Sequence, residues 1–485
     1  MNMPAVGTPE DTICAIATPA GEGGIGIVRI SGPHAVDIAS RVVQLRSEKS
    51  LHTLASHTLY LADILFPPTP SISSHSGSTA SQLTEQIIDE GLVVYMKAPR
   101  SFTAEDVVEL HCHGNGLILQ RICQACIVAG ARLAQAGEFT KRAFLNGRLD
   151  LSQAEAVLDT IRAKSELSLK LAQRQLRGEL AQQVHRLRTE LVRLLAHLEA
   201  GIDFAEEDIT FVQREEMISS LQETLDHVRR MLETAETGRV LREGVRVVIA
   251  GEPNVGKSSL LNCLLRENRA IVTDIPGTTR DIIEESIIWL GLRITLVDTA
   301  GLRDTTDLVE QEGIRRSIEA QGQADIVLYV LDAAQLTQMD LRSLRSRTLH
   351  AEHFLVVNKI DLCDPALVER VTHALRARTP CKVLPISSQT GEGLEALKTA
   401  IQLQFVKPSF EPRDGVVVTH VRHRAALERA ESSLKDALAS VQQDIEPEFV
   451  VVDLRGAADA LGEIVGTITS DEVLDEIFSE FCIGK

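Results

Sequence analysis

Aromatic and basic residues are scarce in this chain. It has 1 Trp, 3 Tyr and 12 Phe among 485 residues, so extensive stacking on nucleic-acid bases is not expected. Lys and Arg number 50 against 68 Asp and Glu, which leaves a formal net charge of −18 at pH 7. Because cationic side chains supply most of the affinity for phosphate backbones, this balance argues against tight, indiscriminate binding of nucleic acid. A nucleic-acid partner would need a local basic patch.

Long apolar runs are also absent. No run approaches the roughly 18 residues that a membrane helix needs. The N-terminus lacks the basic region, apolar core and small-residue cleavage site of a secretory signal. The 8 cysteines are scattered, which favours reduced thiols over a disulfide framework. We therefore expect a cytoplasmic protein without a membrane segment.

The first third of the chain has the pattern of an α/β module. Short apolar runs at Ile25–Ile30, Gly91–Met96 and Val107–His111 alternate with turn signals and predict strands. The glycine-rich stretch Gly21–Gly26 superficially resembles a dinucleotide-binding loop, but a strand-like run follows it instead of the required helix. The total length allows about three domains.

Helical periodicity follows this module and returns near the C-terminus. Apolar residues recur at three- and four-residue spacing from Leu176 to Leu198, which predicts one face of a long helix, and again from Leu427 to Val441. Ser470 is predicted to cap a final helix. Since neither stretch can hide its apolar face alone, we expect the two to pack together with a nucleotide domain inserted between them. The predicted segments are 1–147 (α/β), 148–243 (helical, first part), 244–407 (nucleotide-binding) and 408–485 (helical, second part).

A phosphate-binding loop is the strongest local signal. The apolar strand Val245–Ala250 runs into G-E-P-N-V-G-K-S (Gly251–Ser258) and then into a leucine-rich helix. In such a loop the glycines let backbone N–H groups face the phosphates, Lys257 reaches the outer phosphates, and the Ser258 hydroxyl ligates magnesium.

Further motifs in the expected order indicate a GTPase. An apolar strand ends in D-T-A-G (Asp298–Gly301), which suits magnesium binding through water and sensing of the γ-phosphate. The run N-K-I-D (Asn358–Asp361) supplies a carboxylate that accepts from guanine N1 and the exocyclic amine, which adenine cannot match. The segment containing Ser387 and Ser388 resembles the loop that closes on the base.

One position departs from the Ras-like pattern. There, the glycine of D-T-A-G is followed by a glutamine that orients the attacking water, but this chain has Leu302. Another group must therefore orient the water. Asn254 lies within the phosphate loop, where its amide oxygen can hold a monovalent cation near the β/γ bridge and supply positive charge without an arginine finger.

Longer motifs resemble the MnmE (also called TrmE) family of GTPases for wobble-uridine modification of tRNA. They are A-T-P-x-G-x-G-G-I-G-I-x-R-I-S-G (Ala17–Gly32), S-F-T-x-E-D-V-x-E-L-x-x-H-G (Ser101–Gly114), G-E-F-x-x-R-A-F-L-N (Gly137–Asn146), T-D-I-P-G-T-T-R-D (Thr273–Asp281) and F-C-I-G-K (Phe481–Lys485). The resemblance spans nearly the whole chain. It implies an N-terminal α/β tetrahydrofolate-binding-like domain, a central helical domain and an inserted Ras-like P-loop GTPase domain.

The resemblance implies a homodimer whose nucleotide domains meet when GTP and potassium bind. Potassium would be held by Asn254, Thr273, Ile275 and Thr278, magnesium by Ser258 and Thr279, and the water would be oriented by Glu310. The full predicted GTP-binding set is Asn254, Val255, Gly256, Lys257, Ser258, Ser259, Thr273, Asp274, Ile275, Pro276, Gly277, Thr278, Thr279, Asp298, Thr299, Ala300, Gly301, Asn358, Lys359, Asp361, Ser387 and Ser388.

The resemblance also implies a one-carbon site. Its predicted contacts with a 5-formyl- or 5,10-methylene-tetrahydrofolate are Arg29, Glu109, Arg148 and Lys485. Arg148 stands where other members carry Lys, which keeps the charge but changes the geometry. Cys482 is expected near the one-carbon chemistry, in a role that the sequence does not define.

The expected function is modification of tRNA together with a flavoprotein partner, MnmG (GidA) in the family. The pair would add an aminomethyl-type group, such as carboxymethylaminomethyl, to C5 of the wobble uridine. The alternative is a ribosome-assembly GTPase, which can share the phosphate loop, potassium use and the apolar residue after D-T-A-G.

Overall fold

The computed structural model describes residues 11–67, 86–203, 213–266, 284–298, 322–336, 353–406 and 415–485. The chain divides into two compact units. The first consists of Met1–Leu158, Gln175–His185 and Leu461–Lys485, and the second of Asp159–Arg174 and Arg186–Ala460. Each unit is therefore assembled from segments that lie far apart in the sequence.

The first unit contains a sheet in the order β3-β4-β5-β6-β2-β1-β7. The paired strands are antiparallel except β1 and β7, which are parallel. The strand bounds are β1 Ile13–Ile16, β2 Gly23–Ser31, β3 Val43–Leu45, β4 Leu59–Phe66, β5 Gln86–Met96, β6 Val107–Gly114 and β7 Arg132–Leu133. The glycine-rich stretch thus leads into a strand, as predicted.

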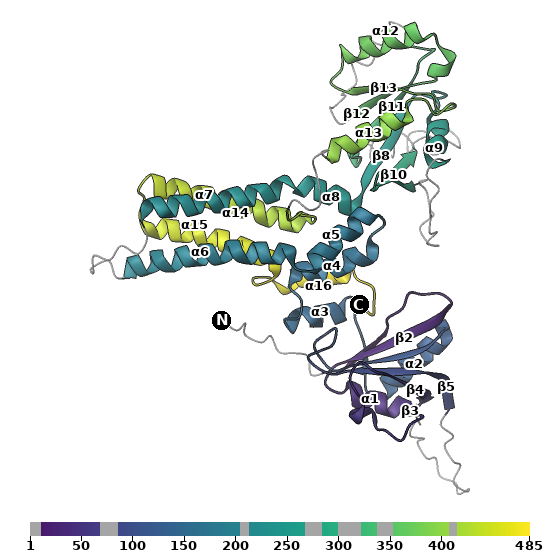
Figure 1. The fold of residues 1–485 in the computed structure, drawn as a ribbon, viewed down its shortest axis with the longest axis vertical. Coiled ribbons are helices and arrows are strands. Elements are labelled where there is room, and N and C mark those ends of the chain that lie inside the picture. Colours follow the sequence, from purple (N-terminus) through teal and green to yellow (C-terminus); the bar gives the residue numbers. More distant parts are fainter. Residues whose placement is uncertain are drawn as a thin grey trace, which may run out of the picture. The chain divides into compact units, whose positions relative to one another are not determined.

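Two helices, α1 (Ala35–Val42) and α2 (Gly116–Val128), pack on this sheet (Figure 1). Alternate residues of β6, such as Val108 and Leu110, are buried in the same apolar cluster as Ile122 of α2. This alternation follows from the two-residue period of a strand. It sends the intervening side chains of β6 to the opposite face.

A smaller helical layer completes the first unit. Helices α3 (Glu138–Leu145) and α16 (Asp471–Ser479) contact each other, and Phe478 is buried against the start of α4 (Leu151–Arg162). Ser470 occupies the N-cap position of α16 as predicted, but its side chain makes no capping hydrogen bond.

The predicted single helix from Leu176 to Leu198 is wrong at its start. Leu176 ends α5 (Glu166–Leu176), and α6 (Glu179–Asp203) begins after a turn. Gly178 in that turn has φ +83°, a left-handed conformation that glycine adopts without a Cβ penalty. The apolar spacing continues across the turn, which is why periodicity alone did not reveal it.

Helices that lie wholly or mostly in the second unit come from both sides of the nucleotide-binding segment. They are α7 Arg214–Glu233, α8 Ala235–Glu243, α14 Val421–Gln442 and α15 Pro447–Val465. Helices α7 and α14 lie side by side (Figure 1), and Arg229 Nε lies 3.0 Å from Glu431 Oε1 across them. Helices from before and after the nucleotide-binding segment therefore pack against each other here, through α7 and α14.

The nucleotide-binding segment is built on a sheet in the order β13-β12-β11-β8-β10-β9. All pairs are parallel except β10 and β9. The bounds are β8 Val245–Gly251, β9 Glu284–Trp289, β10 Leu292–Asp298, β11 Ile326–Asp332, β12 His353–Asn358 and β13 Lys382–Pro385. The described helices after these strands are α9 Lys257–Arg266, α12 Pro365–Arg376 and α13 Leu394–Phe405. In a parallel sheet, ligands bind at the carboxyl ends of the strands.

A buried ion pair at Asp159 joins three parts of the second unit. Asp159 is near the end of α4, Arg242 is in α8, which leads into β8, and His420 immediately precedes α14. Asp159 accepts hydrogen bonds from His420 Nε2 at 2.8 Å and from Arg242 Nε at 2.9 Å. Burial raises the pKa of Asp159, but the His420 hydrogen bond and the Arg242 charge outweigh it and hold the pKa below its ordinary value.

The predicted fold class is confirmed: α/β and helical parts with an inserted P-loop domain. The boundaries of the four predicted segments stay a prediction. No helix among the described residues is both long and apolar enough to cross a membrane.

Candidate functional site

The phosphate loop leads from β8 into α9, the arrangement that the sequence predicts. Asn254 and Gly256 have φ of +63° and +97°, so the loop turns through two left-handed residues. The Lys257 ammonium is nearly buried and donates to the carbonyl oxygens of Gly251 at 3.0 Å and Glu252 at 2.7 Å. Lys257 is therefore folded back over its own loop, at the amino end of α9, where a phosphate is favoured.

Asn358, at the carboxyl end of β12, begins the N-K-I-D run (Asn358–Asp361), called the base loop below. Its side chain links the base loop to the phosphate loop. Its Nδ2 donates to the carbonyl of Val255 at 3.0 Å. Its Oδ1 accepts from both the backbone N and the Oγ of Ser388, at 3.0 and 2.9 Å. A Cβ built on Gly256 would lie 2.3 Å from Asn358 Nδ2, so glycine is required for this close approach.

Asp361 is held in place by the next loop. The Ser387 hydroxyl, fully buried, donates to Asp361 Oδ1 at 2.5 Å and itself accepts from the backbone N of Thr390 at 3.1 Å. The backbone N of Ile360 donates to Ile386, at 3.3 Å. The N-K-I-D run and the Ser387–Ser388 loop thus form one hydrogen-bonded unit, as expected for loops that enclose a base.

The predicted one-carbon contacts come together on the first unit. Arg29 and Glu109 are directly opposite each other on β2 and β6, and Arg29 Nε donates to Glu109 Oε1 at 2.8 Å. His111 Nε2 lies 3.3 Å from the other carboxylate oxygen. Burial raises the pKa of Glu109, but the His111 hydrogen bond and the Arg29 charge outweigh it and lower the pKa. Glu109 is therefore an anion at neutral pH.

Aromatic rings lie among these charges. The guanidinium carbon of Arg29 lies 5.5 Å from the centre of the Phe102 ring and 5.6 Å from that of Phe139. Arg148 stacks over the same Phe102 ring at 5.2 Å and donates to the Phe102 carbonyl. Such cation–π contacts hold guanidinium groups in fixed orientations.

The C-terminal tail docks beside this cluster. The backbone N of Phe139 donates to the Lys485 carbonyl at 3.2 Å, and Ile483 forms an antiparallel bridge with Ala136. Burial lowers the pKa of the Lys485 ammonium, with a further contribution from Arg29, while Glu109 and Cys482 act in the opposite direction. These charges therefore lie within electrostatic reach of each other. The Cys482 residue itself is exposed.

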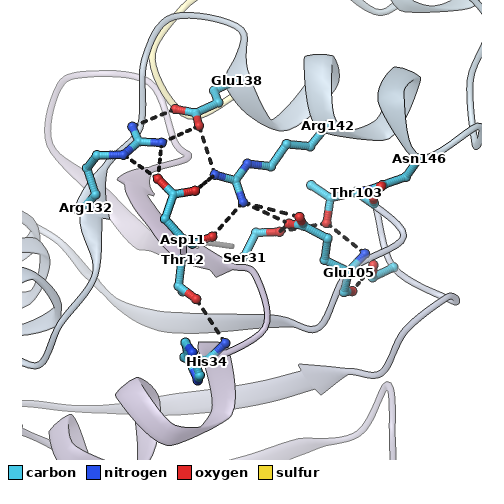
Figure 2. Close-up of polar contacts among 11 residues, drawn as sticks. Asp11, Thr12, Ser31, His34, Thr103, Glu105, Arg132, Glu138, Arg142 and Asn146 are labelled. Atoms are coloured by element: carbon cyan, nitrogen blue, oxygen red, sulfur yellow. Dashed lines mark hydrogen bonds and ion pairs between the residues drawn. The ribbon is translucent and has the colours of Figure 1, made fainter. Parts of the chain in front are cut away.

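A buried arginine, Arg142, anchors the loop that follows Phe102 through its contacts with Glu105, which Figure 2 shows. Arg142 is 1% exposed and lies 2.7 Å from Asp11, 3.3 Å from Glu105 and 3.0 Å from Glu138. An arginine is buried at acceptable cost only when its charge is paired in this way. The residues that join this polar cluster in the figure are Thr12, Ser31, His34, Thr103, Arg132 and Asn146.

The matches to known proteins cover nearly the whole chain. Two family models match it: the MnmE helical domain over residues 151–482 and the GTP-binding protein TrmE N-terminus over residues 12–148. The tRNA modification GTPase MnmE of Symbiobacterium thermophilum is 46% identical over 477 residues, covering 98% of this chain and 100% of that protein. That of Heliobacterium modesticaldum is 45% identical over 480 residues, covering 98% and 99%.

The chain belongs to the MnmE family of tRNA modification GTPases. Among solved structures, the G domain of the T. maritima iron transporter FeoB is 30% identical over 33% of this chain and 98% of that chain, with a TM-score of 0.25. As a member of this family, the chain is a GTPase.

Several predicted residues lie outside the described part of the chain. They are Thr273, Asp274, Ile275, Pro276, Gly277, Thr278, Thr279, Thr299, Ala300, Gly301 and Glu310. Asp298 ends β10, where only its backbone is described. The potassium, magnesium and water-orienting roles therefore stay predictions.

Sequence reasoning missed three residues that the geometry adds to these sites. Phe102 and His111 lie within the predicted one-carbon cluster, and Asp332 bonds to Lys359 of the base loop at 2.7 Å. Asp332 had a readable signal, since it ends the apolar run I-V-L-Y-V-L-D next to the base-binding strand. His111 also had a local signal, since a strand places it on the same face as Glu109, two residues away. Phe102 lies within the motif Ser101–Gly114, but only loop packing brings its ring to Arg29.

Proposed function

We propose that this GTPase of the MnmE family acts in the cytoplasm as a homodimer with a flavoprotein partner, MnmG (GidA) in the family. Together they add an aminomethyl-type group to C5 of the wobble uridine of certain tRNAs. The carbon comes from a tetrahydrofolate derivative, and GTP hydrolysis drives opening and closing of the dimer. The observation that carries the one-carbon part is the convergence of Arg29, Glu109, Arg148 and the tail residues Cys482 and Lys485.

The residues of this cluster fit a folate. A folate carries carboxylates, which Arg29, Arg148 and Lys485 can pair with, and ring N–H groups, which the anionic Glu109 can accept from. The Phe102 ring adds an apolar face for a flat ring system. When bound, the folate would supply the one-carbon unit. The residues of this chain would hold the folate, with Cys482 on the same C-terminal tail as Lys485.

Potassium activation is proposed on a smaller observation. Asn254 offers an amide oxygen, a donor that suits a hard cation. Its backbone is fixed in the left-handed conformation, and its carbonyl accepts from Lys359 Nζ at 2.7 Å. We propose Asn254 with Thr273, Ile275 and Thr278 as the potassium ligands, Ser258 and Thr279 as the magnesium ligands, and Glu310 as the residue that orients water. Bound potassium would supply positive charge at the β/γ bridge.

The first test is nucleoside mass spectrometry of tRNA from cells that lack this protein. Loss of the C5-substituted wobble uridine supports the proposal. Unchanged tRNA, together with accumulation of ribosomal precursors, would favour the ribosome-assembly GTPase instead.

Two further measurements test separate parts of the proposal, GTP hydrolysis by the purified chain and tRNA modification in the presence of the partner. Replacing potassium by sodium should slow GTP hydrolysis, and Asn254→Ala should remove the difference between the two salts. Cys482→Ser should abolish tRNA modification while folate binding persists; full modification by this variant would remove the thiol from the mechanism.

A further inference from the structure

Asp332 is a buried carboxylate at the carboxyl end of β11. Its side chain is 4% exposed, its Oδ2 accepts from Lys359 Nζ at 2.7 Å, and its Oδ1 accepts from the backbone N of Ala334 at 3.0 Å. In the parallel register of the sheet it lies directly opposite Asn358. Asp332 therefore borders the base loop from the neighbouring strand without belonging to any of the nucleotide-binding motifs in the sequence.

Lys359 connects Asp332 to the phosphate loop. The same ammonium that meets Asp332 donates to the carbonyl oxygen of Asn254, also at 2.7 Å. Lys359 itself has φ +64°, a left-handed backbone conformation that costs about 1 kcal/mol for a residue with a Cβ and needs support from its surroundings. A continuous path of short bonds thus runs from Asp332 through Lys359 to Asn254.

The negative charge of the buried Asp332 carboxylate also requires its pairing with Lys359. A buried carboxylate is unfavourable unless a cation and hydrogen-bond donors compensate it, and Lys359 is the cation that meets it here. The negative charge of Asp332 also reaches the base loop. After burial, it is a cause of the raised pKa of the Cys363 thiol, together with Asp361.

We propose that Asp332 is a positioning residue of the guanine-nucleotide site, orienting Lys359 so that the base loop and the phosphate loop are held in one fixed relation. This deepens the nucleotide site assigned to Asn254–Ser259 and Asn358–Asp361 and rests on that assignment. In this role Asp332 acts without contacting the nucleotide. Its effect on affinity passes through the Lys359 ammonium.

The test is the affinity and dissociation rate of a fluorescent GDP on the full chain, for the wild type, Asp332→Ala, Asp332→Asn, Lys359→Met and the double variant Asp332→Ala/Lys359→Met. A charge-assisted bond of this kind corresponds to about ten- to hundredfold in affinity. We expect Asp332→Ala to lose about that much. Asp332→Asn should recover part of it, since its amide oxygen still accepts from Lys359. The double variant should bind no worse than Lys359→Met alone.

Asp325 provides a matched control, because it lies immediately before the opposite end of β11 and bonds to Arg239 and to the backbone N of Arg246. Asp325→Ala should affect thermal stability without changing GDP affinity. Additive losses in the double variant, or GDP affinity of Asp332→Ala within about twofold of wild type, would overturn the positioning role. Unchanged affinity in Lys359→Met would instead show that the nucleotide site is wrongly assigned.

Discussion

Gly484 is the residue through which the C-terminal tail can be displaced most specifically. It has φ +100°, and a Cβ built on it would lie 2.2 Å from the carbonyl oxygen of Ile16. Real Cβ atoms essentially never come within 3.0 Å of another heavy atom, so Gly484→Ala must move backbone against backbone. The left-handed φ adds about 1–2 kcal/mol of strain. Because Gly484 immediately precedes Lys485, the tail should leave its docked position and carry the ammonium away from Arg29 and Glu109.

The expected result is weaker folate binding by the full chain. Losing one charge-assisted bond from Lys485 corresponds to about ten- to hundredfold in affinity, measured by titration calorimetry with 5-formyl-tetrahydrofolate. Lys485→Met should lose a similar amount, and GDP binding should be unchanged in both variants. Gly116→Ala is the control, since an added Cβ there meets no heavy atom within 4 Å. Wild-type folate affinity in Gly484→Ala would refute the reasoning that the docked tail forms part of the site.

Three further substitutions test other parts of the structure. Gly256→Ala would place a Cβ 2.3 Å from Asn358 Nδ2, and we expect fluorescent GDP to bind at least about a hundredfold more weakly; affinity within about twofold of wild type would contradict this close approach. Asp361→Asn should move the base preference from guanine toward xanthine, measured as hydrolysis of GTP against XTP, because the amide can donate where the carboxylate accepts. Asp159→Asn should lower the free energy of unfolding by about 3 kcal/mol at pH 7. The pKa of Asp159 in the folded protein is below its ordinary 3.8, so this stabilisation is present above pH 3.8 and is lost as the pH falls through the folded pKa. If wild type and variant differed in free energy of unfolding by the same amount at pH 7 and pH 2.5, the ion pair of Asp159 would be contradicted.

The place of the candidate nucleotide site in the fold could be predicted from sequence because its short motifs lie on successive strands. Lys257, Asn358, Asp361 and Ser387 each follow an apolar run, and parallel strands bring their carboxyl ends to one edge. The predicted fold class also followed from these apolar runs, which indicate strands, and from the helical periodicity between them. Asp332 was missed because a lone acid at a strand end resembles an ordinary surface residue until its partner is known.

The first unit was harder to predict because its contacts join residues far apart in the sequence. Arg142 would be expected on the surface from its type alone. It is buried because carboxylates from three separate segments, at Asp11, Glu105 and Glu138, surround it. The Arg29–Glu109 pair depends on strand register, which the apolar alternation of β2 and β6 fixes only once the two strands are known to be neighbours. The error at Leu176 has the opposite cause, since local periodicity there continued across a glycine turn.

Backbone hydrogen bonds hold the C-terminal tail in place, so its position does not depend on the side chains of Cys482 and Lys485. The bonds that dock it join the carbonyls of Cys482 and Lys485 to the backbone N of Gly137 and Phe139, at 3.5 and 3.2 Å. None of these bonds involves the thiol or the ammonium, so replacing either side chain should leave the other where it is. A thiol required for the reaction and an ammonium required for folate binding can therefore be removed independently. Gly484, by contrast, controls both, because the approach of its backbone to β1 admits no side chain.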